Sequence, residues 1–123
     1  MAQLPPDYLT TMPLLITMPA MKIVFNAPFD NKATYYMRVT NPGLTRIGFA
    51  FETKAKRIEM SPRQWILDPQ ESAYVAITRD ALDPSRDNIK DDSVIVKWCR
   101  VPQRGRSEYF MIGRKELPIE YNV

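Results

Sequence analysis

The chain has 123 residues, of which 45% are hydrophobic and 25% charged, and its formal net charge is +3. This length and apolar content are typical of one folded domain and argue against a disordered chain. Because there is no histidine and only one cysteine, the composition excludes Ser-His-Asp and Cys-His catalysis, histidine-ligated zinc and an internal disulfide.

The same features bear on the compartment. A lone cysteine fits a reducing environment, and the sequence has no run of about 18 apolar residues that would span a membrane. The first residues, MAQLPPDYLTTMPLL, lack the basic start of a signal peptide. We therefore expect a cytoplasmic protein without a membrane span. The mild positive charge predicts a solvated surface rather than a nucleic-acid footprint.

The N-terminal part is rich in proline, and the eleven prolines of the chain leave little room for long helices. Residues 1–13 predict an arm, in front of a folded domain at residues 14–123. Within the domain, Leu14–Met18 and Lys22–Asn26 are short strand candidates divided by Pro19. Because proline at a strand end favours an edge position, we expect this segment to switch between two sheets.

The central feature of the sequence is a pair of alternating segments, Thr34–Thr40 and Ile47–Thr53. Every second residue is apolar, which is the period of a half-buried strand. Between them, Asn41-Pro42-Gly43 predicts a turn, because proline lacks an N–H and glycine tolerates a positive φ. We expect a hairpin with one apolar face that a second sheet must cover. The residues of that face are Tyr35, Met37, Val39, Ile47, Phe49 and Phe51.

The second half of the chain continues with short strands and turns. Asp83 followed by Pro84 predicts one helical turn with Asp83 as its N-cap. In Ser93–Val101, the clearest late strand, the alternation directs Trp98 to the core. About seven short strands with proline and Asn/Asp turns between them predict an all-β sandwich. The other strand candidates are Ile58–Met60, Trp65–Leu67, Ser72–Thr78, Ser107–Ile112 and Leu117–Asn122.

Six segments of the chain stand out as a set of recognisable motifs: VFNAPFD (Val24–Asp30), TRIGFAFET (Thr45–Thr53), LDPQES (Leu67–Ser72), DALDPSRD (Asp80–Asp87), VKWC (Val96–Cys99) and RKELPIEYN (Arg114–Asn122). In this order they closely resemble one known family, the major sperm protein (MSP) of nematodes. The resemblance covers the chain from about Pro19 to Val123. Because the segment after Pro102 is shorter than in filament-forming members, the chain looks like a small sperm-specific relative.

This resemblance implies a seven-stranded immunoglobulin-like β-sandwich without enzymatic activity or a cofactor. It also implies two alternative functions. Filament-forming members are dimers that polymerise without nucleotide in crawling sperm, which predicts a structural protein that forms homodimers or joins MSP-type filaments. A membrane-anchored branch of the family binds acidic, phenylalanine-containing peptides, which predicts an adaptor instead. In both cases the partners are proteins. By the same resemblance, the chain itself is expected in the sperm cytoplasm or cytoskeleton.

The candidate partner-binding residues come from two arguments. Tyr36, Ala50 and Ile95 face away from the core if the alternation is right, and they are expected to form a flat apolar patch, unless the methionine-rich arm covers it. A basic loop follows the second central strand and offers charge to an acidic peptide; its residues are Lys54, Lys56 and Arg57. The positions aligned with the peptide-binding lysines and methionine of the adaptor branch hold Ala50, Glu52, Ser93 and Ile95, which disfavours that binding mode.

Other clusters have ordinary structural interpretations. Lys97, Arg100, Arg104 and Arg106 form the densest positive cluster, but they lack the exposed aromatic residues that single-stranded nucleic acid needs. Cys99 is expected to pack as a small half-buried side chain. Four loop carboxylates lack the spacing of a calcium site: Asp83, Asp87, Asp91 and Asp92. We therefore nominate no catalytic, cofactor or metal residue.

Overall fold

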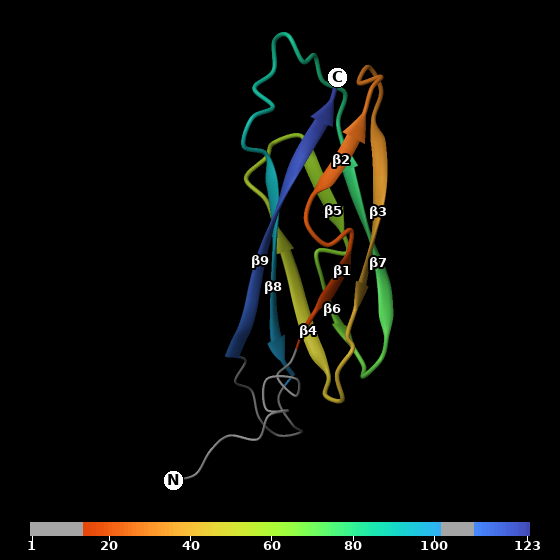
Figure 1. The fold of residues 1–123 in the computed structure, drawn as a ribbon, viewed down its shortest axis with the longest axis vertical. Coiled ribbons are helices and arrows are strands. Elements are labelled where there is room, and N and C mark those ends of the chain that lie inside the picture. The colour runs from red at the N-terminus through yellow and green to blue at the C-terminus, as the bar shows by residue number, and fades with distance from the viewer. Residues whose placement is uncertain (1–13, 102–109) are drawn as a thin grey trace.

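The computed structural model describes residues 14–101 and 110–123, and within this part the chain forms two β-sheets without a helix (Figure 1). Since no helix occurs in these residues, none is present there that is long and apolar enough to cross a membrane. The strands are β1 (Ile16–Met18), β2 (Ile23–Asn26), β3 (Ala33–Thr40), β4 (Ile47–Glu52), β5 (Ile58–Ser61), β6 (Gln64–Leu67), β7 (Ser72–Arg79), β8 (Ser93–Arg100) and β9 (Phe110–Asn122).

The two sheets face each other as the layers of an immunoglobulin-like sandwich. One sheet has the strand order β1-β3-β7-β5, and the other has the order β2-β9-β8-β4-β6. All neighbouring strands run antiparallel except β2 and β9, which are parallel. The sandwich predicted from the sequence is therefore confirmed.

The prediction of a hairpin between the two central strands is wrong. β3 pairs with β1 and β7 in one sheet, whereas β4 pairs with β6 and β8 in the other. The physical reason is burial. Each strand has a single apolar face, and placing the strands in opposite layers lets these faces cover each other, while a hairpin would leave both facing the same way.

Five of the six residues predicted for the apolar face of the central strands are buried. Met37, Val39 and Ile47 are completely buried, and Phe49 and Phe51 are each 3% exposed. The sixth, Tyr35, is partly buried and packs against this core. The Phe49 and Phe51 rings meet edge to face, with centroids 5.7 Å apart, a geometry that aromatic pairs prefer. The apolar residues of both sheets therefore meet in one shared core between the layers.

The N-terminal segment switches between the sheets, as predicted. β1 pairs with β3, and after Pro19 the chain crosses to pair β2 with β9. At the other end, Leu117–Asn122 does not form a separate strand but continues β9. Pro118 is tolerated within β9 because the pairing with β8 ends at Pro118 and the pairing with β2 begins at Ile119.

The turn predicted at Asp83 is present as a single hydrogen-bonded turn. The backbone N–H groups of Arg86 and Asp87 both donate to the Asp83 carbonyl, at 3.0 and 2.8 Å. The Asp83 side chain caps the turn by accepting from the Ser85 backbone N–H at 3.0 Å. The Ser85 hydroxyl also donates to the same carboxyl, at 2.7 Å, and these two hydrogen bonds lower the pKa of the Asp83 carboxyl below its usual value, so the cap is ionised at neutral pH.

Candidate partner-binding surfaces

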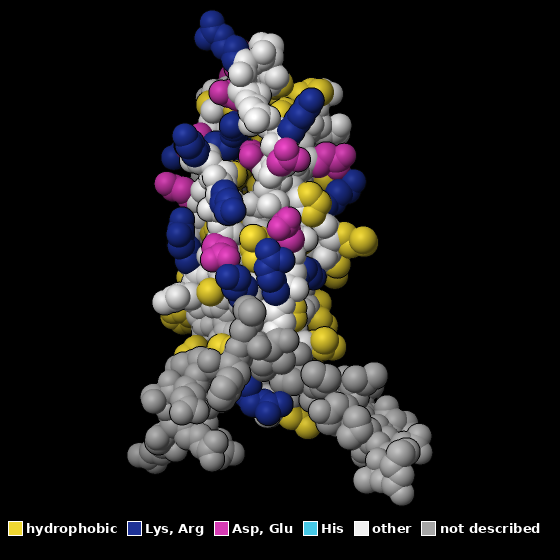
Figure 2. All heavy atoms as spheres, turned by 90° about the vertical axis from the view of Figure 1, so that its left-hand side faces the viewer, with side chains coloured by type: hydrophobic (Ala, Val, Ile, Leu, Met, Phe, Trp, Pro, Cys, Tyr) yellow, Lys and Arg dark blue, Asp and Glu magenta, His cyan; other side chains and the backbone are white. Residues whose placement is uncertain are grey.

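The outer face of the five-stranded sheet carries Ala50 on β4 and Ile95 on β8. Ala50 is paired with Lys97 and Glu52 with Ile95, so the apolar pair lies on one diagonal and the charged pair on the other. Lys97 Nζ and Glu52 Oε1 are 2.8 Å apart. Figure 2 shows Lys and Arg side chains interspersed with Asp and Glu over this side of the molecule. The face is therefore mixed in character and is not a flat apolar patch.

Tyr36 does not join Ala50 and Ile95. It lies on β3, where it pairs with Ala76 of β7, and its side chain is 65% exposed. It therefore faces outward from the four-stranded sheet, on the opposite side of the sandwich. The predicted three-residue patch is wrong, because the hairpin that would have brought these residues to one sheet does not exist. A partner-binding role for each of them separately stays a prediction.

The three basic residues of the loop after β4 differ in solvent exposure. Lys54 and Lys56 are exposed. The Arg57 side chain is only 19% exposed, and its Nε lies 3.5 Å from an Asp92 carboxylate oxygen. Arg57 Nη2 also donates to the Asn88 carbonyl at 3.0 Å. Arg57 is therefore a structural contact between two loops, while Lys54 and Lys56 remain accessible to a partner.

A small depression of about 240 Å³ lies beside Ile95, between the start of β8 and β9. Its lining carries both signs of charge, from the cations Lys54 and Arg114 and the carboxylates Asp91, Asp92 and Glu116. An acidic peptide entering here would meet carboxylates as well as cations, and like charges repel. The structure thus adds a reason against acidic-peptide binding to the substitutions already seen in the sequence.

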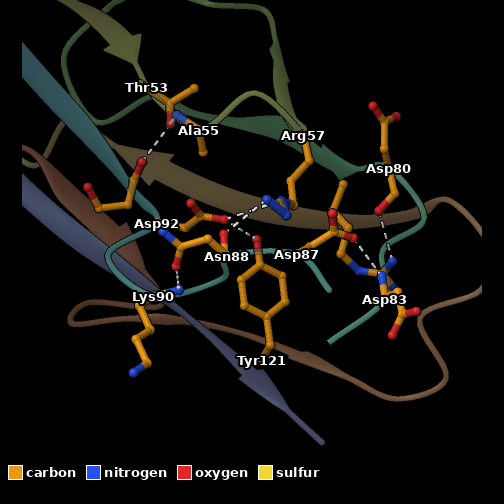
Figure 3. Close-up of polar contacts among 12 residues, drawn as sticks. Thr53, Ala55, Arg57, Asp80, Asp83, Asp87, Asn88, Lys90, Asp92 and Tyr121 are labelled. Carbon is orange, nitrogen blue, oxygen red and sulfur yellow. Dashed lines mark hydrogen bonds and ion pairs between the residues drawn. The ribbon is translucent and has the colours of Figure 1, made fainter. Parts of the chain in front are cut away.

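Asp92, in the loop before β8, contacts both Tyr121 of β9 and Arg57 in a partly buried polar cluster (Figure 3). The Tyr121 hydroxyl donates to Asp92 Oδ2 at 2.7 Å. Burial, together with the hydrogen bond and the charge of Asp92, raises the pKa of Tyr121 well above its usual value. The hydroxyl therefore stays protonated and acts as a donor that ties β9 to the loop before β8.

Replacing Tyr121 by phenylalanine is expected to lower the free energy of unfolding by about 1–2 kcal/mol, because Asp92 loses a donor in a partly buried site. Chemical denaturation followed by circular dichroism measures this change. The matched control is Tyr36→Phe, since the Tyr36 side chain is 65% exposed, and it should leave stability unchanged. Equal stability of wild type and Tyr121→Phe would contradict the assigned hydrogen bond.

The other residues singled out in the sequence are the basic cluster, Cys99 and the loop carboxylates, and several of them already have contacts within the protein. Lys97 is paired with Glu52, Arg100 is exposed, and Arg104 and Arg106 lie outside the described residues. Cys99 faces Gly48, and burial raises the pKa of its thiol, which disfavours the reactive thiolate. Of the loop carboxylates, Asp83 and Asp87 accept hydrogen bonds within their own turn.

Sequence reasoning missed the exposed edge of the five-stranded sheet. Strand β6 is the last strand of that sheet, and it carries Trp65, 57% exposed, and Ile66, 40% exposed. A shallow depression of about 520 Å³ runs beside it. The signal was present in the sequence, since two large apolar residues stand in a short strand between Pro62 and Pro69, but it did not reveal which sheet the strand joins.

The family of the chain is shown by comparison with known proteins. Residues 14–117 match the family model of the MSP (Major sperm protein) domain. The chain is 54% identical over 132 aligned positions to "Major sperm protein 1" of Globodera rostochiensis, with 100% of both chains covered. It is 41% identical over 116 positions to "Major sperm protein 2" of Onchocerca volvulus, with 87% of this chain and 91% of the relative covered.

A solved structure supports the fold independently. The fold is similar to that of SSP-19, an MSP-domain protein like family member in Caenorhabditis elegans, with a TM-score of 0.70 and 19% identity over 88% of this chain and 99% of that one. At this identity the likeness concerns the fold alone. The family is established by the sequence matches: the family model and the two relatives show that the chain belongs to the MSP domain family.

Proposed function

We propose that this chain is a non-enzymatic structural protein of nematode sperm that acts in the cytoplasm by associating with itself or with MSP-type filaments. The observation that supports it best is the full-length identity of 54% to a protein named major sperm protein 1. The associating unit is the domain at residues 14–123, and the arm at residues 1–13 lies outside the described residues.

The surface chemistry supports association rather than peptide capture. The outer faces of the two sheets offer exposed Tyr36 on one side and, on the other, exposed Ala50 beside the half-buried Ile95. The site that corresponds to the adaptor branch carries Glu52 and Glu116 near Ile95. These carboxylates would repel an acidic peptide, so the adaptor function is disfavoured.

Electron microscopy and sedimentation of the purified protein, alone and mixed with a filament-forming MSP, test this proposal. We expect concentration-dependent association alone, or recovery of the protein in pelleted filaments of the relative. The control is the same mixture with an unrelated immunoglobulin-like domain of similar size, which should remain in the supernatant. A protein that stays monomeric at millimolar concentration and never pellets with the relative would refute the proposal.

A further inference from the structure

The outer face of the four-stranded sheet carries a group of neighbouring exposed side chains, which we call the tyrosine face. Met18, Arg38 and Tyr74 lie in one row across β1, β3 and β7, because each pairs with the next. Ile16 on β1 and Tyr36 on β3 stand two residues from this row and therefore on the same face. The exposed fractions of the four apolar side chains are 45% for Ile16, 64% for Met18, 65% for Tyr36 and 63% for Tyr74.

The tyrosine face has one central cation. A single exposed apolar residue is ordinary, but a group of them around a charge indicates an interaction site. Arg38 is the only basic residue on the outer face of these four strands, and the only acidic one, Glu59, lies two strands away on β5, opposite Thr78. Among residues 14–101 and 110–123, no carboxylate forms an ion pair with Arg38. A fitting occupant is therefore apolar and carries an anion.

The first 13 residues of the chain start at the edge of this same sheet. Leu14 leads into β1, which is an edge strand and begins with Ile16 opposite Thr40. The chain therefore enters the sheet at the Thr40 end of β3. Thirteen extended residues reach about 40 Å, whereas the eight residues of β3 span about 27 Å. If the chain reverses direction at this joint, where Pro13 suits a turn, the segment is long enough to cross the whole tyrosine face.

The sequence of this segment, MAQLPPDYLTTMP, has the matching chemistry. Its only charged side chain is Asp7, which is an anion for Arg38. Pro5-Pro6 favours the extended polyproline conformation, which packs on aromatic rings and loses little entropy on binding. Because that conformation rises about 3.1 Å per residue, placing Asp7 at Arg38 puts Pro5 about 6 Å further along the face. This matches the distance of about 7 Å along β3 from Arg38 to Tyr36.

We propose that residues 1–13 fold back over the tyrosine face of their own chain, with Asp7 paired with Arg38 and Pro5-Pro6 packed on Tyr36 and Tyr74. Because an exposed ion pair contributes little by itself, most of the contact comes from the prolines and the tyrosine rings. The arm is then a built-in cover, and a partner of this face must displace it. The contact lies within one chain, so it does not depend on self-association or on filaments.

A nitroxide spin label on Gln3→Cys, in a full-length Cys99→Ser background, tests this contact by nuclear magnetic resonance. Since Gln3 stands four residues before Asp7, the label is expected near Thr34, at the end of β3 that is far from the joint. It should therefore broaden the amide signals around Thr34 more than those next to Leu14. An arm that does not bind would broaden chiefly the signals next to Leu14, and this result would overturn the proposal.

Substitutions in the labelled protein identify the contacts. Asp7→Asn should lower the ratio of bound to free arm about twofold to fivefold, a typical effect for an exposed ion pair, and Arg38→Gln should do the same. Pro5→Ser together with Pro6→Ser should release the arm more strongly. The matched control is Arg114→Gln, which removes an exposed arginine from the outer face of the other sheet and should leave the broadening unchanged. Circular dichroism verifies folding. Broadening that survives both Asp7→Asn and Arg38→Gln would contradict the proposed pairing.

A mixed sample shows which chain the arm binds. Spin-labelled chains without isotope are mixed with isotope-labelled chains without the spin label, and no broadening is expected. Broadening in this mixture would place the arm on a second copy and overturn the contact within one chain. Broadening around Ala50 and Ile95 would place the arm on the other sheet and also overturn it. These outcomes are distinct from those of the proposed function, because a monomer that never joins filaments can give the expected result and a self-associating protein can fail to give it.

Discussion

Replacing Arg79 by alanine is expected to lower the free energy of unfolding by about 4 kcal/mol, which would leave a domain of this size close to unfolding. Arg79 is 1% exposed, although it carries a permanent charge. Its Nη1 donates to the carbonyls of Asn31 and Asp80 at 3.0 and 3.2 Å, and its Nη2 donates to the Pro28 carbonyl at 3.3 Å. The side chain thus joins the β2–β3 connection to the end of β7.

The large effect has three causes. Truncation leaves three carbonyls without a donor, in a part-buried site where each unsatisfied group costs about 1–3 kcal/mol. It also opens a cavity. Finally, it removes the guanidinium from the rings of Phe25 and Phe29, whose centroids lie 5.4 and 5.0 Å away. No carboxylate pairs with Arg79 among the described residues, so its contacts are carbonyl dipoles and ring faces.

Denaturant titration of Arg79→Ala, with Arg79→Lys and Arg46→Ala beside it, measures this effect. Lysine keeps the charge but not the planar fork, so Arg79→Lys should recover only part of the stability. Arg46 is an exposed arginine paired with Asp68 at 3.0 Å, and its loss should cost less than about 1 kcal/mol. A change below about 1 kcal/mol in Arg79→Ala would mean that the three carbonyls find other donors, and it would contradict the structural role of the guanidinium.

Asn41→Ala is expected to cost about 3 kcal/mol, since this completely buried side chain holds the crossing from β3 to β4 in place. Its Nδ2 lies within 2.8 to 3.2 Å of the carbonyls of Thr45, Leu67 and Asp68, and its Oδ1 accepts from the Gly43 backbone N–H at 3.0 Å. One amide therefore ties the interlayer connection to the end of β6. Alanine would leave these backbone groups without partners.

Asn41→Asp sharpens this prediction, because aspartate has nearly the same shape. It keeps an acceptor for Gly43 but places a carboxylate beside three carbonyl oxygens, so it should destabilise at least as much as alanine. The control is Asn26→Ala. The Asn26 side chain is exposed and accepts a hydrogen bond from Asn122 at 3.0 Å, so its loss should change the free energy of unfolding little. Thermal and chemical unfolding of the three variants give the comparison. An Asn41→Asp protein as stable as wild type would contradict the donor role of the amide.

Much of the fold could be predicted because strand patterning is local. The alternation that buries Met37 and Phe49 is visible in the sequence, as is the capping chemistry at Asp83. The sheet partner of each strand was not visible, since the pattern of β3 and β4 suits either a hairpin or a crossing between layers. That single ambiguity separated Tyr36 from Ala50 and Ile95, and it accounts for the failure of the predicted apolar patch.

Two features of the candidate surfaces depended on contacts between distant residues. Arg57 looked like a free loop charge, but Asp92 draws it inward across a sequence separation that no local pattern reveals. Trp65 looked like a strand residue before a turn, and its exposure follows from the place of β6 at the end of the sheet. Charge pairing and edge position are properties of the assembled fold rather than of a segment.

The sequence by itself determined that this protein is an all-β sandwich of the MSP family with a core of alternating apolar residues, because burial of one face of each strand is encoded in period-two patterning. Only the tertiary structure decided which strands share a sheet, where Arg79 and Asn41 find their carbonyl partners, and which strand is left with an open edge. These features depend on the packing of segments far apart in the chain, and the free energy of such contacts is not recorded in any one stretch of residues.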